Sequence, residues 1–434
     1  MRRMLRACDE EGRTGEMTLR ILDQNEHGRT RCLWEEVFTE DTKTFLDYYY
    51  YIKTRDNQIY VVEEDGQICS MLQLNPYMVR MEDKEFPSAY IIAVATKEQY
   101  RRRGYMGALL RASLNDMYAK KIPFTFLMPA AEAIYKPYDF RYVYSQHIGQ
   151  LVCEEGSFLW KCSKDEEEAG TRGRIAQSST GKITFCDAGL WDADEMSAFF
   201  NEHFAERYQV CTVRDGAYYQ TMIMEQQSEG GGVRLMRKDG VLKGFYAYAA
   251  EEGLEVREPV FLPGYENEFR TSVGEMEESV KGFGQNIEKS GEKISTDAGQ
   301  GRDSVKVHAC PPKYAFEEKP LIMARIVCLP EFLAALKVEE QLTVDCSFAV
   351  IDPIITQNSR IWRVTSGEGE TELHVRETED SEGVLPMAEL TEILFGRRTI
   401  EEAKAQEGVI IPGHLGGELE KITKLKRIFF NEVV

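Results

Sequence analysis

The chain has 434 residues, 43% hydrophobic and 29% charged, which is the composition of an ordinary folded protein of two to four domains. Its formal net charge of −20 argues against nucleic acid as a partner and favours cationic small molecules, although acidity can also serve solubility alone. No segment approaches the ~20 uninterrupted apolar residues that span a bilayer, so no membrane partner is expected. The ten cysteines include no C-x-x-C pair and the six histidines are dispersed. This pattern indicates a reduced, cytoplasmic protein without disulfides or a metal site.

Residues 1–16 turn acidic before any apolar run appears, so they are not a secretory signal. We expect them to be a disordered extension, or to precede a true start at Met17, where the first convincing strand pattern begins. That strand, at 18–22, leads into two predicted helices at 25–38 and 41–54, each with aromatic residues at helical spacing.

A β-hairpin is predicted at 59–81, with Asp65-Gly66 as its turn. The next strand, 88–96, is too apolar to be half-exposed and should lie centrally in its sheet. A helix follows Gly104, and a second strand and a tyrosine-rich turn occupy 124–144. One apolar stripe runs along that helix, formed by Met106, Leu109, Leu110, Leu114 and Met117.

Beyond residue 150 two further blocks are visible. A charged run at 161–174 predicts a linker or an exposed loop, and the stretch from 183 repeats the strand-then-helix opening of the first block. Residues 265–303 are polar and Gly/Ser-rich, so they are either a degenerate helix with a loop or partly disordered. From about 316 the sequence pattern changes again. It predicts a strand, a helix starting near Pro330, three more strands and two helices, the second with Thr399 as N-cap. The chain then ends in apolar and aromatic residues.

The turn between the central strand and the following helix carries the strongest functional signal. Arg101, Arg102, Arg103 and Gly104 stand where the helix begins, and a helix start leaves its first N–H groups without intrahelical partners. These donors and the positive end of the helix dipole suit a diphosphate, glycine permits close approach, and arginine adds charge-assisted contacts. The competing interpretation is an ordinary basic helix cap. The flanking strand and helix favour the ligand site.

The run IIAVATKEQYRRRGYMGALL, followed by FTFLMP and AIYKPYDFRYVY, resembles the GNAT superfamily of acyl-coenzyme A-dependent N-acyltransferases. The aromatic opening CLWEEVFTEDTKTFLDYYYY, a second block without its own RRRG turn and a last block beginning IMARIVCLPEFLAAL are similar to the Eis (enhanced intracellular survival) acetyltransferases. The resemblance implies an α+β fold. Its parts would be a catalytic GNAT domain (1–156), a degenerate GNAT domain (157–315), both with mixed, mostly antiparallel sheets flanked by helices, and a sterol-carrier-like α+β domain (316–434).

The same resemblance implies acetyl-CoA as co-substrate and assigns the residues that bind it. The main chain of Val94, Ala95 and Thr96 would pair with the pantetheine arm, and the diphosphate would be surrounded by Arg101, Arg102, Arg103, Gly104, Tyr105, Met106 and Gly107. Two positions depart from the family. Met106 replaces a small residue, and Asp139 replaces a glycine, which leaves the turn geometry there open because aspartate tolerates unusual backbone angles better than most residues.

Acyl transfer to an amine needs a neutral amine, a stabilised oxyanion and a protonated leaving thiolate. Tyr135 matches the family's general acid, since a phenol stays protonated at neutral pH. The alternative is a tyrosine that only packs in the core. The base implied by the family is the chain's own C-terminal carboxylate, at Val434, with Glu432 as a second candidate. The alternative is that this apolar end only completes the core of the last domain.

The acceptor cavity is expected beside Trp34, Phe38 and Glu35 or Glu36, with Asp41 and Asp47 adding negative charge. Such a cavity suits a cationic amine, either an aminoglycoside or a lysine-bearing peptide. It is equally open that Trp34 and Phe38 are simply core residues. The competing function is a coenzyme A-responsive or apolar-ligand binding protein that uses the acyltransferase fold as a scaffold. The family also implies a homo-oligomer, a hexamer.

Overall fold

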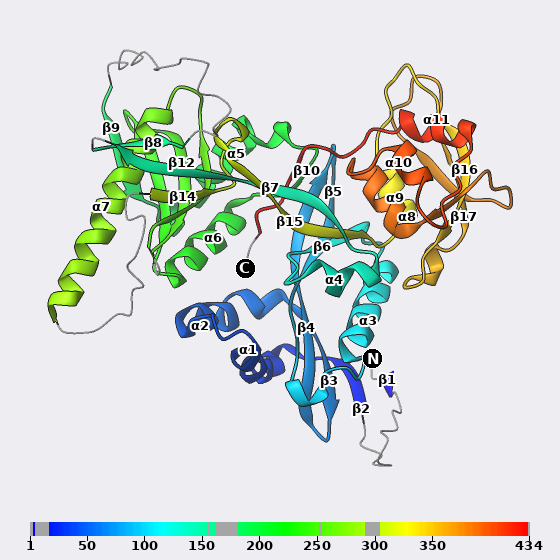
Figure 1. Cartoon of the computed structure of the whole chain (residues 1–434), viewed down its shortest axis with the longest axis horizontal. Coiled ribbons are helices and arrows are strands. Elements are labelled where there is room, and N and C mark those ends of the chain that lie inside the picture. The colour runs from blue at the N-terminus through cyan, green and yellow to red at the C-terminus, as the bar shows by residue number, and fades with distance from the viewer. Residues whose placement is uncertain are drawn as a thin grey trace. The chain divides into compact units, whose positions relative to one another are not determined.

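The protein is described here by a computed structural model that covers residues 3–4, 17–154, 156–161, 181–250, 253–290 and 304–432 (Figure 1). Two compact units form. The first combines residues 1–144, 207–213 and 320–434, and the second combines 145–206 and 214–319. Both contain mixed sheets flanked by helices, so the predicted α+β class is confirmed.

The first unit is built on a sheet whose strands follow one another along the chain, except for the last. Every neighbouring pair is antiparallel apart from β5 and β6, which are parallel. The order is β1 (Arg3–Met4), β2 (Met17–Ile21), β3 (Gln58–Glu64), β4 (Gln67–Met81), β5 (Lys84–Thr96), β6 (Phe124–Leu127) and β15 (Glu317–Ile326). The predicted hairpin between β3 and β4 is present, and Asp65 and Gly66 both adopt positive φ in its turn.

Helices cover both faces of this sheet. Successive side chains of β4 point to opposite faces, so each face has residues that pack against a helix. Leu72 and Leu74 pack with helix α3 (Tyr105–Ala119), whose predicted apolar stripe is confirmed, with Met106 only partly buried. Gln73 and Asn75 face the other way and meet the Tyr49 hydroxyl of α2 (Lys43–Tyr51). Helix α1 (Arg31–Val37) lies on this second face, preceded by the short helix η1 (Gln24–Thr30).

Two short strands from distant parts of the chain complete the first sheet. Strand β10 (Val210–Thr212) pairs antiparallel with the far end of β4, and β20 (Ile428–Phe429) pairs parallel with β10. The apolar chain end is thereby part of the core, where Phe430 stacks on Phe126 of β6 with ring centroids 4.5 Å apart.

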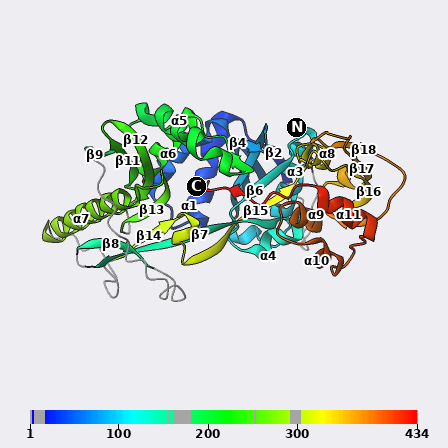
Figure 2. The ribbon, with the colours of Figure 1, turned by 90° about the horizontal axis from the view of Figure 1, so that it is seen from above.

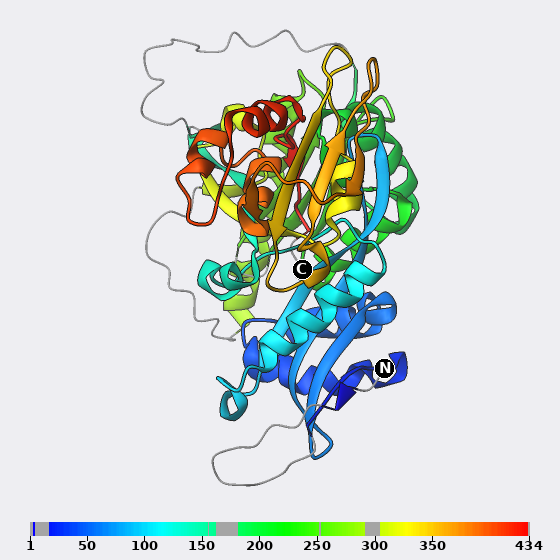
Figure 3. The same cartoon turned by 90° about the vertical axis from the view of Figure 1, so that its right-hand side faces the viewer.

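The C-terminal part of the first unit has a sheet of its own, in the order β18-β17-β16-β19 (Figure 3, yellow to orange). Thr399 caps a helix as predicted, since its hydroxyl accepts the N–H of Glu402. One further helix, α11 (Gly413–Lys421), was not predicted because Gly416 and Gly417 obscure its pattern. The elements are α8 (Leu329–Ala334), β16 (Asp345–Ile351), β17 (Ile361–Thr365), β18 (His374–Glu377), β19 (Val384–Pro386), α9 (Met387–Leu394), α10 (Ile400–Lys404) and α11.

The second unit also has helices on both faces of a sheet (Figure 2). Phe245 of β12 packs against Phe199 of α5 and Tyr219 of α6, whereas its neighbour Tyr246 packs against Phe269 of α7. The elements are β7 (Arg141–Glu154), β8 (Ser157–Trp160), β9 (Ile183–Asp187), α5 (Ala193–His203), α6 (Gly216–Ser228), β11 (Gly232–Lys238), β12 (Val241–Ala249), β13 (Glu255–Phe261), α7 (Glu266–Ser290) and β14 (Ser304–His308).

Helix α7 decides between the two interpretations of residues 265–303. The helical one is right as far as Ser290, and residues 291–303 lie outside the described part of the chain, as do most of the predicted linker and of the N-terminal extension. None of the described helices, α7 included, is both long and apolar enough to cross a membrane.

Candidate active site

Strand β5 leaves one of its edges open beyond Tyr90. In the described part of the chain it pairs with β4 as far as Thr96, but with β6 only at one position, Tyr90 with Phe126. A bulge lies between, where the register with β4 shifts and Ala93 adopts a φ of 51°. Bulges bend a strand and end its pairing, and here the bend separates β5 from β6.

The polar groups on this open edge belong to Val94 and Thr96. Lys97 donates its N–H to Cys69 of β4, and the Ala95 carbonyl accepts from Ser70, so residues 95 and 97 point toward β4. Because successive residues of a strand alternate, Val94 and Thr96 direct their main-chain groups the other way. An extended ligand can therefore add to β5 as a strand would.

The turn that follows β5 presents backbone N–H groups and positive charge together. Arg102 has a φ of 65° and Gly104 a φ of 80°, and Gly104 is the N-cap of α3 without a side-chain capping bond. The first amides of the helix, from Tyr105 to Gly107, precede the first intrahelical bond, which Ala108 donates to Gly104. The three arginines before Gly104 are all exposed.

Two of these arginines are already oriented by neighbours. Arg101 donates through Nε to the Thr96 carbonyl at 3.3 Å, and Arg103 lies 3.6 Å from Glu64 and over the ring of Tyr100. In the described residues, Arg102 has no ion-pair partner. The turn therefore keeps its positive charge beside an uncapped helix start, and these residues fit a diphosphate followed by an extended arm.

At Gly107 the tyrosine turn touches the start of α3. A Cβ at this position would lie 2.5 Å from the Tyr138 hydroxyl, and Arg111 one turn later lies over the Tyr138 ring. The bulkier Met106 is accommodated one residue earlier, where it is partly buried. The small residue of the motif thus stands one position later, at Gly107, where it contacts the tyrosine turn.

Tyr135 ends the one-turn helix α4 (Glu132–Tyr135), directly before the short helix η4 (Lys136–Tyr138). Its side chain is buried against Phe140, and burial raises the pKa of its phenol to about 12. Asp139 then takes φ 63° and ψ 18°, the left-handed conformation that glycine adopts most easily. The turn therefore keeps a glycine-like geometry despite the aspartate.

Sequence reasoning did not identify Tyr90 or Tyr77 as members of this site. Burial raises the pKa of Tyr90, and the negative forms of Tyr77, Tyr135 and Glu432 near its hydroxyl raise it further. Tyr77 is within reach of Lys53, which donates to its hydroxyl at 3.0 Å. Both tyrosines sit in apolar strands, where nothing in the local pattern separates a site residue from a core residue.

The end of the described chain reaches the same tyrosine cluster. Glu432 is buried and accepts a short hydrogen bond from the Thr212 hydroxyl of β10. Val434, the predicted base, lies outside the described residues, two positions further along.

The predicted acceptor-binding residues lie on the α1–α2 face of the sheet. Trp34 is buried among Phe38, Phe45 and Tyr49, and its indole N–H donates to Asp41 at 2.6 Å. Burial raises the pKa of Asp41. Glu35 is exposed and shares the Arg31 guanidinium with Asp47, at 2.8 and 2.7 Å. Among the described residues, no group of three or more acidic, cysteine or histidine side chains could hold a metal ion.

Comparison with known proteins agrees with this geometry at the level of domains. The family model described as Acetyltransferase (GNAT) domain matches residues 18–143, and the model described as Sterol carrier protein domain matches residues 329–433. No curated protein matches the chain in sequence.

Solved structures with the same fold extend over nearly the whole chain. A probable N-acyltransferase of unknown function from Enterococcus faecalis V583 is 17% identical with a TM-score of 0.72, and covers 95% of this chain and 98% of its own. A GCN5-related N-acetyltransferase from Anabaena variabilis is 14% identical with a TM-score of 0.66, covering 94% and 98%. Eis1 from Mycobacterium abscessus is 13% identical with a TM-score of 0.62, covering 95% and 98%. These likenesses confirm the fold implied by the resemblance.

Proposed function

Because the chain carries a GNAT acetyltransferase domain followed by a sterol carrier protein domain, we propose that it is an acetyl-CoA-dependent N-acetyltransferase for a cationic amine. The observation that supports this most is the sequence of features after Tyr90. An open strand edge leads directly into a glycine and arginine turn at an uncapped helix start. A solvated basic cap would need the arginines alone, without the bulge at Ala93 or the open edge.

Each part of this surface would hold one part of the co-substrate. The main-chain N–H groups of Val94 and Thr96 would donate to the pantetheine amides, and their carbonyls would accept from them. Ala95 lies between these two residues. The diphosphate would lie on the amides of Tyr105, Met106 and Gly107, with charge from Arg101, Arg102 and Arg103. The bound thioester supplies an activated acetyl group, and the chain supplies the proton transfers.

Tyr135 would act as the general acid that protonates the departing thiolate. Its burial keeps the phenol protonated, since the pKa is raised to about 12. In the described part of the chain its hydroxyl has no hydrogen-bond partner, which leaves its proton for the ligand.

The Val434 carboxylate would receive the proton of the attacking amine. Support comes from Glu432, because its burial and its bond to Thr212 fix the chain two residues earlier, near Tyr90. A carboxylate held close to a cationic acceptor attracts the ammonium and can accept its proton as general base.

The acceptor would enter from the side of Trp34, Phe38 and Glu35. Only part of that set is available for contact, because Trp34 is buried and Glu35 is paired with Arg31. The preference for a cationic amine rests mainly on the net charge of −20.

Calorimetry with coenzyme A and thiol release from acetyl-CoA with a panel of amines test this proposal together. Binding and amine-dependent thiol release are expected. Binding without release from any amine would favour the alternative, a coenzyme A-responsive binding protein. No heat of binding would remove the co-substrate assignment itself.

A further inference from the structure

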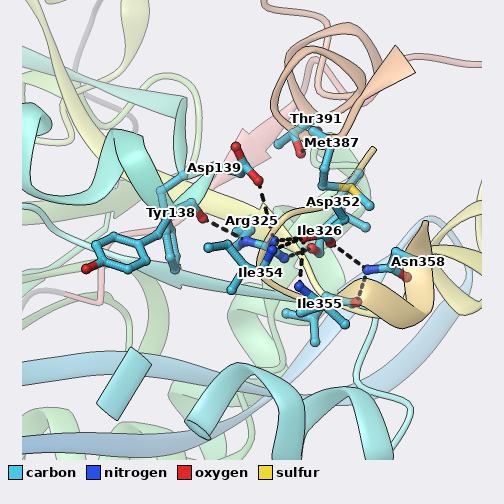
Figure 4. Close-up of polar contacts among 12 residues, drawn as sticks. Tyr138, Asp139, Arg325, Ile326, Asp352, Ile354, Ile355, Asn358, Met387 and Thr391 are labelled. Carbon is cyan, nitrogen blue, oxygen red and sulfur yellow. Dashed lines mark hydrogen bonds and ion pairs between the residues drawn. The ribbon is translucent and has the colours of Figure 1, made fainter. Parts of the chain in front are cut away.

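A fully buried arginine connects the tyrosine turn to the C-terminal part of the first unit (Figure 4). Arg325 lies on β15, where it is paired with Thr125 of β6. Its Nε donates to the Tyr138 carbonyl at 2.8 Å, and one terminal nitrogen lies 3.6 Å from the Asp139 carboxylate. The guanidinium thus contacts the last two residues of the turn that follows Tyr135.

The other side of the guanidinium is held by Asp352. Arg325 Nη2 donates to Asp352 Oδ1 at 2.6 Å, and Nη1 donates to the Ile326 carbonyl at 2.8 Å. The Asp352 carboxylate also accepts the N–H groups of Ile354 and Ile355 and the side-chain amide of Asn358. Because every member is buried and bonded, the orientation of Arg325 is fixed from the C-terminal side.

The helix that carries Tyr135 cannot hold its own position. Helix α4 has four residues, far fewer than the ~12–15 at which an isolated helix becomes even marginally stable. After it the chain turns through the left-handed Asp139. Directly after Tyr135, the Lys136 carbonyl accepts from Arg141 at 3.1 Å. The Tyr138 carbonyl and the Asp139 carboxylate anchor the rest of the turn, and the fully buried Arg325 contacts both.

The carboxylate of Asp139 and the guanidinium of Arg325 lie opposite one another. A glycine at 139 would provide the same backbone conformation, whereas aspartate adds a largely buried carboxyl group. Burial raises the pKa of this group, although the attraction of Arg325 acts to lower it. Arg141, Asp352 and Glu389 are the other charged groups that act on it. An aspartate at this place is tolerable because a guanidinium stands opposite it.

We propose that Arg325 is a positioning residue for the acetyl transfer, through which Asp352 of the C-terminal part holds the turn that places Tyr135. This inference rests on the proposed role of Tyr135 as general acid. It assigns the C-terminal part a task in catalysis that needs no ligand of its own.

The first experiment replaces Arg325 by lysine, which keeps the charge and loses the planar fork that reaches Tyr138, Ile326 and Asp352 together. We expect kcat to fall at least ~10-fold while the KM for acetyl-CoA and the affinity for coenzyme A stay within ~threefold, since a displaced acid affects the step and not the binding. Arg363→Lys is the matched control. It perturbs another arginine–aspartate pair of the C-terminal part, in which Arg363 donates two hydrogen bonds to Asp345, at 2.8 and 2.7 Å, on an exposed surface.

A second measurement does not depend on turnover. Protein labelled with 3-fluorotyrosine gives a ¹⁹F signal for Tyr135, assigned by its loss in Tyr135→Phe. Arg325→Lys should shift this signal and Arg363→Lys should not. If the lysine variant does not fold, Asp139→Asn replaces it. This change removes the carboxylate that lies opposite Arg325 and keeps the side-chain size, and it should give the same two effects in smaller size.

A folded variant at Arg325 or Asp139 with kcat and the Tyr135 signal both unchanged would overturn the positioning role, and so would a fall in kcat without a shift of the signal. If the wild type shows no transfer to any amine, the proposed function fails, and the ¹⁹F signal alone then decides whether Arg325 positions Tyr135.

Discussion

Both units contain a bulged strand followed by a helix, and their helix starts differ in charge. Ala93 in β5 and Glu258 in β13 adopt nearly the same φ, 51° and 49°. Helix α3 begins twelve positions after Ala93, whereas α7 begins eight positions after Glu258. The shorter turn of the second unit has no counterpart of the three arginines. Instead Glu266 opens α7 and accepts the N–H of Gly264, so a carboxylate of the protein already occupies the place of an anion.

The two units are also alike in the next strand and in the tyrosine that follows it. Strand β6 is parallel to β5, and β14 is parallel to β13. A short helical turn follows each, with Tyr135 in the first unit and Tyr314 in the second. Tyr314 stacks on Trp160 with ring centroids 4.5 Å apart, whereas Tyr135 meets Phe140 edge to face with ring centroids 6.0 Å apart. The same topology thus places the two tyrosines in different packing environments, a stacked ring in the second unit and an edge-to-face ring in the first.

The largest effect is expected when the start of α3 is given an acidic residue like the one at the start of α7. Met106→Glu places a carboxylate in the first turn of α3. Two like charges ~4 Å apart repel by about 4 kcal/mol at an effective dielectric constant of ~20. Calorimetry should therefore show coenzyme A affinity at least ~100-fold weaker. Met106→Gln has the same size without the charge and should bind nearly as the wild type does. Equal losses in both variants would mean that shape and not charge decides binding.

The two tyrosines provide the next test. Tyr135→Phe should lower kcat about 100-fold or more, because general acid catalysis typically contributes that much, with coenzyme A affinity retained. Tyr314→Phe removes the matching hydroxyl from the second unit and should leave steady-state kinetics unchanged. A Tyr135→Phe enzyme with wild-type turnover would leave Tyr135 as a core residue only.

The difference between the units also shows what the sequence could predict. Strand β5, helix α3 and the turn between them were predicted because their signals are local: an apolar run, a stripe at helical spacing and a cluster of arginines with glycine. Helix α7 was only one of two alternatives, because its glycines and polar residues give a weak pattern even though Phe269 and Val273 are buried.

Contacts between distant residues could not be predicted. Thr212 and Glu432 are 220 positions apart, and the strands that bring them together have three and two residues. Arg325 looked no different from Arg360 and Arg363, which are largely exposed, because a sequence does not reveal which arginine has a buried carboxylate opposite it. The residues that we propose to contact the co-substrate were thus visible in the sequence pattern, and the residues that support them were not.

Glycines with positive φ give a smaller, paired effect. Gly104 has a φ of 80° and Gly264 a φ of 90°, and a Cβ on either would meet nothing within 4 Å. Alanine at either position should lower the free energy of unfolding by about 1–2 kcal/mol, since left-handed backbone is strained for residues with a Cβ. Only Gly104→Ala should also weaken coenzyme A binding, about tenfold or ~1.4 kcal/mol, because the new methyl group stands beside the diphosphate. Urea denaturation and calorimetry on both variants check this. An equal loss of affinity from Gly264→Ala would contradict it.

The smallest effect is expected at the acidic helix start of the second unit. Burial acts to raise the pKa of Glu266, but hydrogen bonds from Lys313 and from backbone N–H groups outweigh it, and the pKa is lowered overall. Because the pKa of Glu266 is lower in the folded state than in the unfolded state, its ionised form stabilises the protein at any pH above the pKa of the unfolded state. This contribution disappears as the pH falls through the pKa of the folded state. Glu266→Gln should therefore cost about 0.3–1 kcal/mol at pH 7 and almost nothing at pH ~3, measured by urea denaturation. Coenzyme A affinity should stay at the wild-type value, because Glu266 occupies the helix start that no diphosphate reaches. A variant that instead gained affinity for coenzyme A would show that the second unit still holds a usable anion site, closed only by its own carboxylate.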